Sequence, residues 1–331
     1  MARLFDLLKC VGLPIMNILV QSIGMKRITI LILIFLSNAV FADISSILLK
    51  DQEIKKLGTG MKFTEGPVWI KKDKKLIFSD IPKSLQMEWT EAKGVKKWRE
   101  VEQSNGNLLD LNGNLLSCQH AGRNLIRTTA NGEIEILADN FEGKKFNSPN
   151  DLAIRSDGEI WFTDPSYGLR GRKAEIEGKW VYRRKTDGSI QVLCKTYDMP
   201  NGIAFSPDEK RVYIADSGNI GKIHAYDVVK EGLLGDPLFE IAIRCDGMCV
   251  DTEGRIYTTS RGGIHVYNSN GKKIGLIAVP EHPANVCFGG EDFDTLFITA
   301  RTSLYSIKIL SLIHISEPTR LLSIWYCVVW V

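Results

Sequence analysis

The sequence contains six copies of one unit that recurs every 39–51 residues. Each copy starts with a turn residue that is Glu, Asn or Asp, and a strand-like run ends 14 or 15 residues later. A period of about 40 to 50 residues with several short strands per copy is typical of a propeller blade. We therefore predict an all-β fold, a six-bladed β-propeller over residues 43–309. The turn residues of the six copies are Glu65, Asn105, Asn150, Asn201, Asp246 and Asn285.

The composition fits one globular domain of this kind. Of the 331 residues, 44% are hydrophobic and 24% are charged, which is ordinary for a soluble chain. The 42 basic and 39 acidic residues leave a formal charge of only +3, without a long Lys/Arg run. The sequence therefore suggests neither a nucleic-acid partner nor an obligate protein partner.

The N-terminal segment has the pattern of a secretory signal peptide at residues 25–42. Two basic residues precede an apolar run from Ile28 to Leu36, and small residues follow at Ala39 and Ala42. The run is shorter than the roughly 20 residues of a membrane span, although a retained N-terminal anchor is the alternative. Residues 1–24 would then be an upstream extension of the reading frame. We expect an exported chain, periplasmic or secreted, that begins near Asp43 and does not contact the membrane after cleavage.

The C-terminal segment does not continue the repeat. The run LSLIHISEPTR resembles the translation of a transposase adapter used in sequencing libraries, and the following residues lack blade pattern and turn chemistry. We therefore expect residues 310–331 to be a non-native tail, with a strand or a membrane-seeking segment as the alternative. The two ends of the propeller should pair to latch the ring, with residues 44–49 as the candidate outer strand of the sixth blade.

Five cysteines lie within the predicted propeller, and an odd number leaves at least one thiol free. Cys245 and Cys249 are too far apart for a disulfide if their segment is extended, because four strand residues span roughly 13 Å against a limit of about 7 Å. We expect most of these thiols to be small buried hydrophobes.

Four turn residues of the repeat combine two carboxylates with two amides. Equivalent positions of the innermost strands lie near the channel axis of a propeller, which brings Glu65, Asn150, Asn201 and Asp246 together. Two buried carboxylates repel each other, and a divalent cation removes this conflict. Oxygen ligands favour Ca²⁺ first, then Mg²⁺ or Mn²⁺, whereas Zn²⁺ is less expected. The alternative is that these residues only form turns, which is the role we expect for Asn105 and Asn285.

Several strings together resemble the senescence marker protein/gluconolactonase family, which also contains regucalcin-like proteins. They are FTEGPVW, SCQHAGR, FNSPNDLAIRSDGEIWFTDPSYG, MPNGIAFSPDEKRVYIADS, CDGMCVD and HPANVCFGG. The resemblance covers residues 45–309 and is closest to bacterial gluconolactonases. It implies a six-bladed propeller with one catalytic metal, bound here by Glu65, Asn150, Asn201 and Asp246. Ser148 stands where the regucalcin branch carries an Arg, so sugar recognition of that kind is not implied.

The resemblance implies metal-dependent hydrolysis of a sugar lactone such as glucono-1,5-lactone. The metal would polarise the lactone carbonyl, and a base would take a proton from the attacking water. Asp246 matches the base proposed for the family. Because a bound cation lowers the pKa of a carboxylate, His120 is the alternative base.

Residues at the strand ends are candidates for substrate binding because propeller loops gather at one rim. Asn150, His120, Asp164 and Tyr167 are expected to contact the substrate. A structural His120 and a capped turn at Asp164 and Tyr167 are the alternatives. Arg261 and Arg301 follow two other strand ends, and we expect them to pair with nearby carboxylates, namely Asp80, Asp164 or Asp216, with substrate capture as the alternative.

Two other functions remain compatible with the sequence. The metal could serve a different electrophile, either another lactone or a phosphotriester. Alternatively, the propeller could be a non-enzymatic binding module with a structural metal.

Overall fold

The computed structural model describes residues 47–48, 52–229 and 232–310. Contacts divide the chain into two units, 1–43 and 44–331, and every described residue belongs to the second unit. The predicted extension at 1–24, the signal peptide at 25–42 and all but the first residue of the tail at 310–331 lie outside the described residues.

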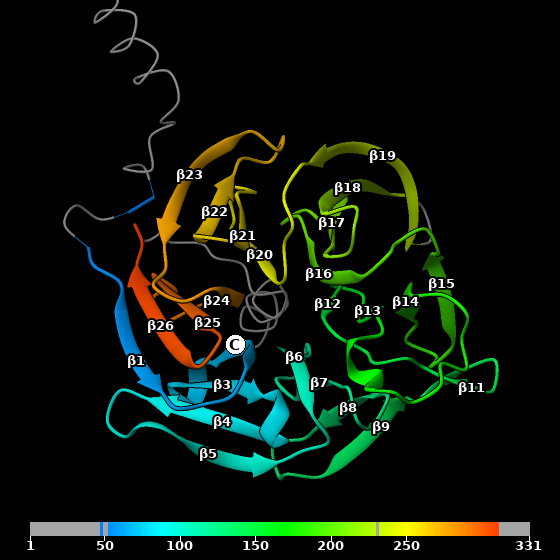
Figure 1. The fold of residues 1–331 in the computed structure, drawn as a ribbon, viewed down its shortest axis with the longest axis horizontal. Coiled ribbons are helices and arrows are strands. Elements are labelled where there is room, and N and C mark those ends of the chain that lie inside the picture. The colour runs from blue at the N-terminus through cyan, green and yellow to red at the C-terminus, as the bar shows by residue number, and fades with distance from the viewer. Residues whose placement is uncertain (1–46, 49–51, 230–231, 311–331) are drawn as a thin grey trace, which may run out of the picture. The chain divides into compact units, whose positions relative to one another are not determined.

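The described residues form six four-stranded antiparallel sheets that surround a central channel as the blades of a propeller (Figure 1). This confirms the fold and the number of blades that the repeat predicts. From inner to outer strand, the first blade contains β2 (Thr64–Ile70), β3 (Lys75–Asp80), β4 (Leu85–Thr90) and β5 (Gly94–Glu100), and the second contains β6 (Ser104–Leu109), β7 (Leu115–Gln119), β8 (Asn124–Thr128) and β9 (Ile134–Ala138). The third blade contains β12 (Leu152–Ile154), β13 (Ile160–Asp164), β14 (Trp180–Arg184) and β15 (Ile190–Cys194), and the fourth contains β16 (Pro200–Phe205), β17 (Arg211–Asp216), β18 (Lys222–Val229) and β19 (Leu233–Ile241). The fifth blade contains β20 (Met248–Val250), β21 (Ile256–Ser260), β22 (Gly263–Tyr267) and β23 (Lys273–Ala278), and the sixth contains β24 (Pro283–Gly289), β25 (Thr295–Ala300), β26 (Ser303–Lys308) and β1 (Lys55–Thr59).

The remaining elements are short. A two-stranded ribbon joins β10 (Asn140–Phe141) to β11 (Lys144–Lys145), and three single-turn 3₁₀ helices complete the fold. Across the described residues, no helix is long and apolar enough to span a membrane. The 3₁₀ helices are η2 (Lys71–Asp73), η3 (Ile81–Lys83) and η4 (Tyr167–Leu169).

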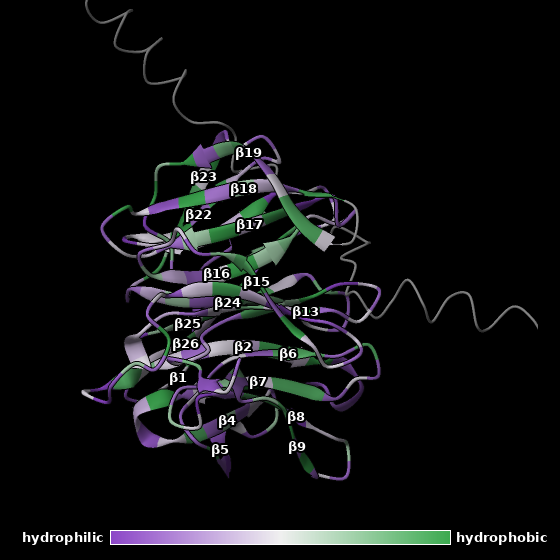
Figure 2. Cartoon of the chain, turned by 90° about the vertical axis from the view of Figure 1, so that its right-hand side faces the viewer, coloured by the Kyte–Doolittle hydropathy of each residue, from purple (hydrophilic) through white to green (hydrophobic). Residues whose placement is uncertain are grey.

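The apolar core lies between neighbouring blades rather than in one central mass. Strands rich in β-branched and aromatic residues pack face to face, and hydrophobic segments run along the strands in Figure 2. Trp69 of the first blade stacks on Phe297 of the sixth, with ring centroids 5.4 Å apart. Trp161 and Phe205 meet edge to face between the third and fourth blades, with ring centroids 5.0 Å apart. These aromatic pairs hold adjacent sheets together.

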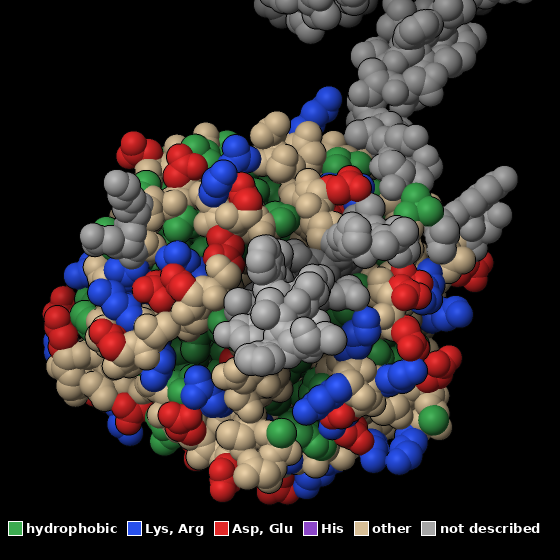
Figure 3. Space-filling model, turned by 180° about the vertical axis from the view of Figure 1, so that it is seen from behind, with side chains coloured by type: hydrophobic (Ala, Val, Ile, Leu, Met, Phe, Trp, Pro, Cys, Tyr) green, Lys and Arg blue, Asp and Glu red, His purple; other side chains and the backbone are tan. Residues whose placement is uncertain are grey.

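Two of the five cysteines are buried and three are half-buried against apolar clusters, so the expectation that most are buried is wrong although all five are packing residues. Cys118 and Cys245 are fully buried in apolar clusters. Cys249 is half-buried, and it forms no disulfide with Cys245. The outer surface is polar, and acidic and basic side chains are interspersed on the face that Figure 3 shows.

The ring closes because an N-terminal strand completes the last blade. β1 pairs antiparallel with β26, with Lys55 opposite Ser306 and Thr59 opposite Ser303. The outer strand of the sixth blade is therefore β1, and not the candidate that the sequence offered at residues 44–49. Leu48 forms only an isolated bridge to Ile309, because residues 47–48 reach β26 just beyond its end.

Glu281 connects the two strands of this closure. Its carboxylate accepts hydrogen bonds from the Thr302 backbone N–H at 3.0 Å and from the hydroxyls of Ser303 and Tyr305. Lys56 of β1 lies 3.6 Å away. Burial disfavours the charged form of Glu281, but the hydrogen bonds together outweigh it and lower the pKa to about 2.

Replacing this carboxylate should weaken the ring closure. We expect Glu281→Gln to lower the free energy of unfolding at pH 7 by about 1–3 kcal/mol, because charge-assisted hydrogen bonds are lost. Denaturant unfolding checks this. The control is Glu291→Gln, an exposed residue paired with Lys74, which should unfold with nearly the free energy of wild type.

The contribution of Glu281 should also depend on pH. A depressed pKa stabilises the fold above the unfolded value of about 4.3, and this stabilisation is lost as pH falls towards the folded value. The difference between wild type and Glu281→Gln should therefore be constant above about pH 5 and shrink towards pH 2. A difference that grows on acidification would contradict this role.

Candidate active site

A cavity of about 460 Å³ opens at the channel, and it collects most of the predicted site residues. Glu65 lies in β2 and Asn201 in β16, while Asn150 and Asp246 lie in the turns just before β12 and β20. The lining includes six of the seven predicted site residues, namely Glu65, His120, Asn150, Tyr167, Asn201 and Asp246.

Local backbone geometry brings the inner strands close enough to converge. Gly106 donates its N–H to the Asn150 carbonyl and Gly202 donates to the Asp246 carbonyl, each at 2.8 Å. A Cβ atom at Gly106 would lie 2.7 Å from the Asn150 oxygen, and one at Gly202 would lie 2.4 Å from the Asp246 oxygen. Each glycine follows a repeat residue because neighbouring backbones touch there. The close approach places the repeat residues of adjacent blades side by side.

Two carboxylates share the floor of the cavity. Glu65 is 2% exposed, and its carboxylate accepts one backbone N–H, from Gly66 at 2.8 Å. Burial raises the pKa of Glu65, and the charges of Asp246 and Asp151 raise it further. Burial also raises the pKa of Asp246, although it is open to the cavity; the Asn201 amide and the Arg301 charge counteract this. Two ionised carboxylates without a cation would therefore be energetically unfavourable at the floor of the cavity.

This donor set fits a hard divalent cation. Two carboxylates and the amide oxygens of Asn150 and Asn201 are the oxygen ligands that such ions prefer. The Asn105 Oδ1 is buried beside them without a hydrogen-bond partner. Within the described ranges no group of three or more His, Cys, Asp or Glu side chains could hold a metal ion. The four candidate ligands include only two such side chains, so amide oxygens would have to supply the rest.

His120 is a buried imidazole in contact with Asn105. It is 5% exposed, and its Nε2 lies 3.1 Å from the Asn105 amide nitrogen. Burial, and then the charges of Arg170 and Arg172, lower its pKa to about 4. This contact also corrects the turn role expected for Asn105, which lines the cavity instead.

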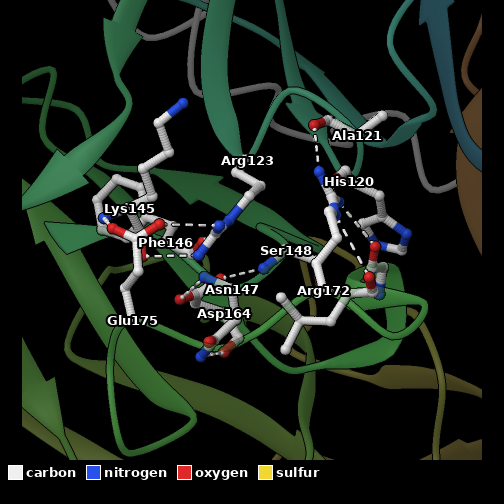
Figure 4. Close-up of polar contacts among 12 residues, drawn as sticks. His120, Ala121, Arg123, Lys145, Phe146, Asn147, Ser148, Asp164, Arg172 and Glu175 are labelled. Carbon is white, nitrogen blue, oxygen red and sulfur yellow. Dashed lines mark hydrogen bonds and ion pairs between the residues drawn. The ribbon is translucent and has the colours of Figure 1, made fainter.

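Arg172 holds the turn that carries His120. Its guanidinium donates to the carbonyls of His120, Ala121 and Gly168, each at 2.8 Å (Figure 4). The loop after η4 is thereby bound to the second blade. His120 reaches the cavity wall in one orientation because its backbone is held from both sides.

Asp164 is placed away from the cavity. Its carboxylate accepts the backbone N–H groups of Asn147 at 2.8 Å and Ser148 at 2.7 Å, as Figure 4 shows. It is fully buried and does not line the cavity. This geometry matches the alternative of a capped turn rather than contact with substrate. The cap orients the segment that leads into Asn150.

The same cap recurs in other blades and explains a wrong expectation. Asp80 accepts the N–H groups of Lys62 and Phe63, and Asp216 accepts those of Asp198 and Met199. These carboxylates are occupied by backbone donors. Among the described residues, neither Arg261 nor Arg301 forms the expected ion pair with Asp80, Asp164 or Asp216, which are used instead to shape the turns.

Tyr167 lies on η4 at the cavity wall and keeps 44% of its surface exposed. Burial and then the Asp246 charge raise the pKa of its phenol, while side-chain hydrogen bonds with Ser217 and Asn201 lower it. Its hydroxyl therefore lies beside Asn201, on the side from which a ligand would enter.

Asp151 is the charged residue that the sequence interpretation missed. Its carboxylate accepts the Leu152 N–H at 3.0 Å and the Asn285 amide at 3.3 Å, and burial raises its pKa to about 7. Both residues line a second cavity of about 220 Å³. Asn285 therefore binds a channel carboxylate, which corrects its expected turn role. The signal was the acidic side chain of SPND, directly after Asn150.

The comparisons with known proteins identify the family of the chain. Residues 63–302 match the model of the SMP-30/Gluconolactonase/LRE-like region, and the chain belongs to this family. The predicted resemblance is thus confirmed. The chain is 29% identical to the gluconolactonase of Zymomonas mobilis, over 77% of this chain and 81% of that protein.

Other relatives extend the likeness to solved structures and to regucalcin. A gluconolactonase structure from Xanthomonas campestris has 32% identity and a TM-score of 0.76, covering 81% of this chain and 92% of that one. Regucalcin from Xenopus laevis is 26% identical over 72% of this chain and 83% of its own length. The first agrees with the predicted likeness to bacterial gluconolactonases, and the second with the predicted relation to regucalcin-like proteins.

The capping role of Asp164 is testable. We expect Asp164→Asn to lower the free energy of unfolding by about 1–3 kcal/mol, because an amide cannot accept both backbone N–H groups as a carboxylate does. The control is Asp187→Asn at an exposed turn, where Asp187 accepts the Ser189 N–H at 2.8 Å. This variant should lose clearly less stability than Asp164→Asn. Wild-type stability combined with a raised KM would instead assign Asp164 to substrate binding.

Proposed function

We propose that the chain hydrolyses a sugar lactone of the glucono-1,5-lactone type. The observation that carries the proposal is the convergence of Glu65, Asn150, Asn201 and Asp246 on one cavity. The proposal is supported by membership of the gluconolactonase family and by relatives named as gluconolactonases. In the reaction, the water oxygen bonds to the carbonyl carbon, the ring ester bond breaks, and the ring oxygen leaves as a hydroxyl. The hydroxy acid then releases one proton at neutral pH.

Four residues would hold the cation of this reaction: Glu65, Asn150, Asn201 and Asp246. Their oxygen chemistry favours Ca²⁺, with Mg²⁺, Mn²⁺ and Zn²⁺ as the other candidates. When bound, the ion supplies positive charge that polarises the carbonyl and stabilises the developing oxyanion.

Asp246 is the group that we assign to take the proton from water, at a carboxylate oxygen. Its carboxylate belongs to the cavity lining, within reach of a bound lactone. His120 is the weaker candidate, because Nε2 already faces the Asn105 amide and its pKa is lowered to about 4. We assign His120, Asn150 and Tyr167 to substrate positioning, with the Tyr167 hydroxyl facing the sugar hydroxyls.

We also propose that the chain acts outside the cytoplasm, in the periplasm or as a secreted protein. The support is the signal-peptide pattern of residues 25–42. N-terminal sequencing of the protein from the extracytoplasmic fraction tests this, and a start at Met1 or Met25 would contradict it.

The lactonase assignment is tested with glucono-1,5-lactone. Protein stripped by chelation should be inactive in a pH-stat assay and should regain hydrolysis when Ca²⁺, Mg²⁺, Mn²⁺ or Zn²⁺ is returned. Asp246→Asn should lose at least about 10²-fold in kcat, because both a cation ligand and the base are removed. It should also lose cation binding in equilibrium dialysis.

The control for this variant is Asp139→Asn, which removes an exposed carboxylate. It should match wild type in both measurements. Normal hydrolysis by Asp246→Asn with normal cation content would remove Asp246 from the mechanism. Turnover of a phosphotriester but of no lactone would contradict the substrate class.

His120→Ala separates positioning from proton transfer. We expect cation affinity to be unchanged and kcat to fall less than about tenfold, because the imidazole orients substrate but does not act as the base. The comparison is made in initial rates at pH 7. A loss of 10²-fold or more with intact cation binding would make His120 the base.

A further inference from the structure

Three arginines line the mouth of the active-site cavity, a feature that hydrolysis of a neutral lactone leaves unused. Arg170 follows η4, Arg244 lies between β19 and β20, and Arg261 lies between β21 and β22. All three side chains are exposed and belong to the cavity lining. The positive charges thus come from separate loops that meet at one opening.

No ion pair among the described residues involves the three arginines of the mouth, Arg170, Arg244 and Arg261; Arg244 donates one hydrogen bond, to the Gly218 carbonyl at 2.8 Å. Five other arginines are held by acids, namely Arg123, Arg127, Arg155, Arg183 and Arg255. Four more donate to neutral oxygen atoms of the protein instead, namely Arg99, Arg172, Arg184 and Arg211. The mouth therefore presents guanidinium N–H donors that no ion pair among the described residues uses.

The positive potential of the mouth acts on neighbouring imidazoles. Apart from burial, the pKa of His120 is lowered by Arg170 and Arg172, and the pKa of His282 is lowered by Arg301 and Arg261. Among the described residues, the acids in the lining are Glu65 and Asp246, which the proposed cation would neutralise. With those two engaged at the floor, the charge at the mouth stays uncompensated.

We infer that the preferred substrate is a sugar lactone that carries an anionic substituent, and that Arg170, Arg244 and Arg261 bind this substituent. The inference rests on the proposed lactonase function, since the lactone carbonyl must lie at the floor while the substituent reaches the mouth. Guanidinium groups bind phosphate and carboxylate through paired N–H donors, which neutral hydroxyls do not require. A charged mouth also raises the rate of encounter with an anion.

The competing account is that the arginines only balance the floor carboxylates. Under that account neutral and anionic lactones should be hydrolysed alike. Two pairs of substrates separate the accounts and also distinguish phosphate from carboxylate. They are glucono-1,5-lactone with its 6-phosphate, and glucono-1,4-lactone with glucaro-1,4-lactone.

We expect wild-type kcat/KM to be at least about tenfold higher for one anionic member than for its neutral partner, with a gap that narrows as salt is added. Arg261→Gln and Arg170→Gln should each reduce the anionic-to-neutral ratio by about three- to tenfold, and Arg261→Lys should restore part of it. The control is Lys97→Gln, which removes an exposed charge paired with Glu100 and should leave the ratio unchanged. Ratios of one or less for both pairs would overturn the inference.

A binding measurement tests the arginines without turnover. Calorimetry with 1,5-anhydroglucitol and its 6-phosphate should show at least about tenfold tighter binding of the phosphate, lost when Arg170, Arg244 and Arg261 are all Gln. Equal affinities would overturn the inference for phosphate. Hydrolysis of neutral lactones without preference for either anion would refute the inference while the lactonase proposal stands. If no lactone were hydrolysed, the lactonase proposal would be refuted. The calorimetry would then test only whether the arginines of the mouth bind an anion.

Discussion

The pairing of β1 with β26 is the interaction on which the rest of the structure depends. It brings residues 55–59 against residues 303–306 and completes the sixth blade. A closed ring makes each inner strand a neighbour of the next, as the contacts from Gly106 to Asn150 and from Gly202 to Asp246 illustrate. Without closure the repeat residues would have no common axis, and the cavity would lose its walls.

Closure has an electrostatic consequence. It brings Glu65, Asp151 and Asp246 near one another in a region where burial already raises the pKa of each carboxyl. The chain manages these charges differently. Asp151 accepts a hydrogen bond from the Asn285 amide and lines the second cavity, whereas Glu65 and Asp246 line the active-site cavity. Buried carboxylates that are left open to a cavity fit a functional role better than a structural one.

The sequence predicted what depends on the repeat. Equivalent positions of the repeat converge in a closed ring, so Glu65, Asn150, Asn201 and Asp246 could be expected at one site from the sequence alone. Contacts between residues at different positions of the repeat were not predictable. Whether Asp164 faces a ligand or caps a turn depends on the path of residues 147–148, which no periodic pattern encodes.

The role of Asp151 and the position of the closing strand were not predicted for the same physical reason. Asp151 follows a repeat residue, and its role depends on the neighbouring Asn285, which lies 134 residues away. The position of the closing strand was also missed, because residues 44–49 and 55–59 both precede the first blade. Register with β26 decides between them, and register is a tertiary property.

The central claim is that one cation occupies the cavity between the floor carboxylates and the two amides. Anomalous diffraction from crystals grown with Mn²⁺ tests this most directly. The account predicts one peak per chain, in contact with Glu65, Asn150, Asn201 and Asp246. No peak at this position, or a peak only beside Asp151 and Asn285, would contradict it.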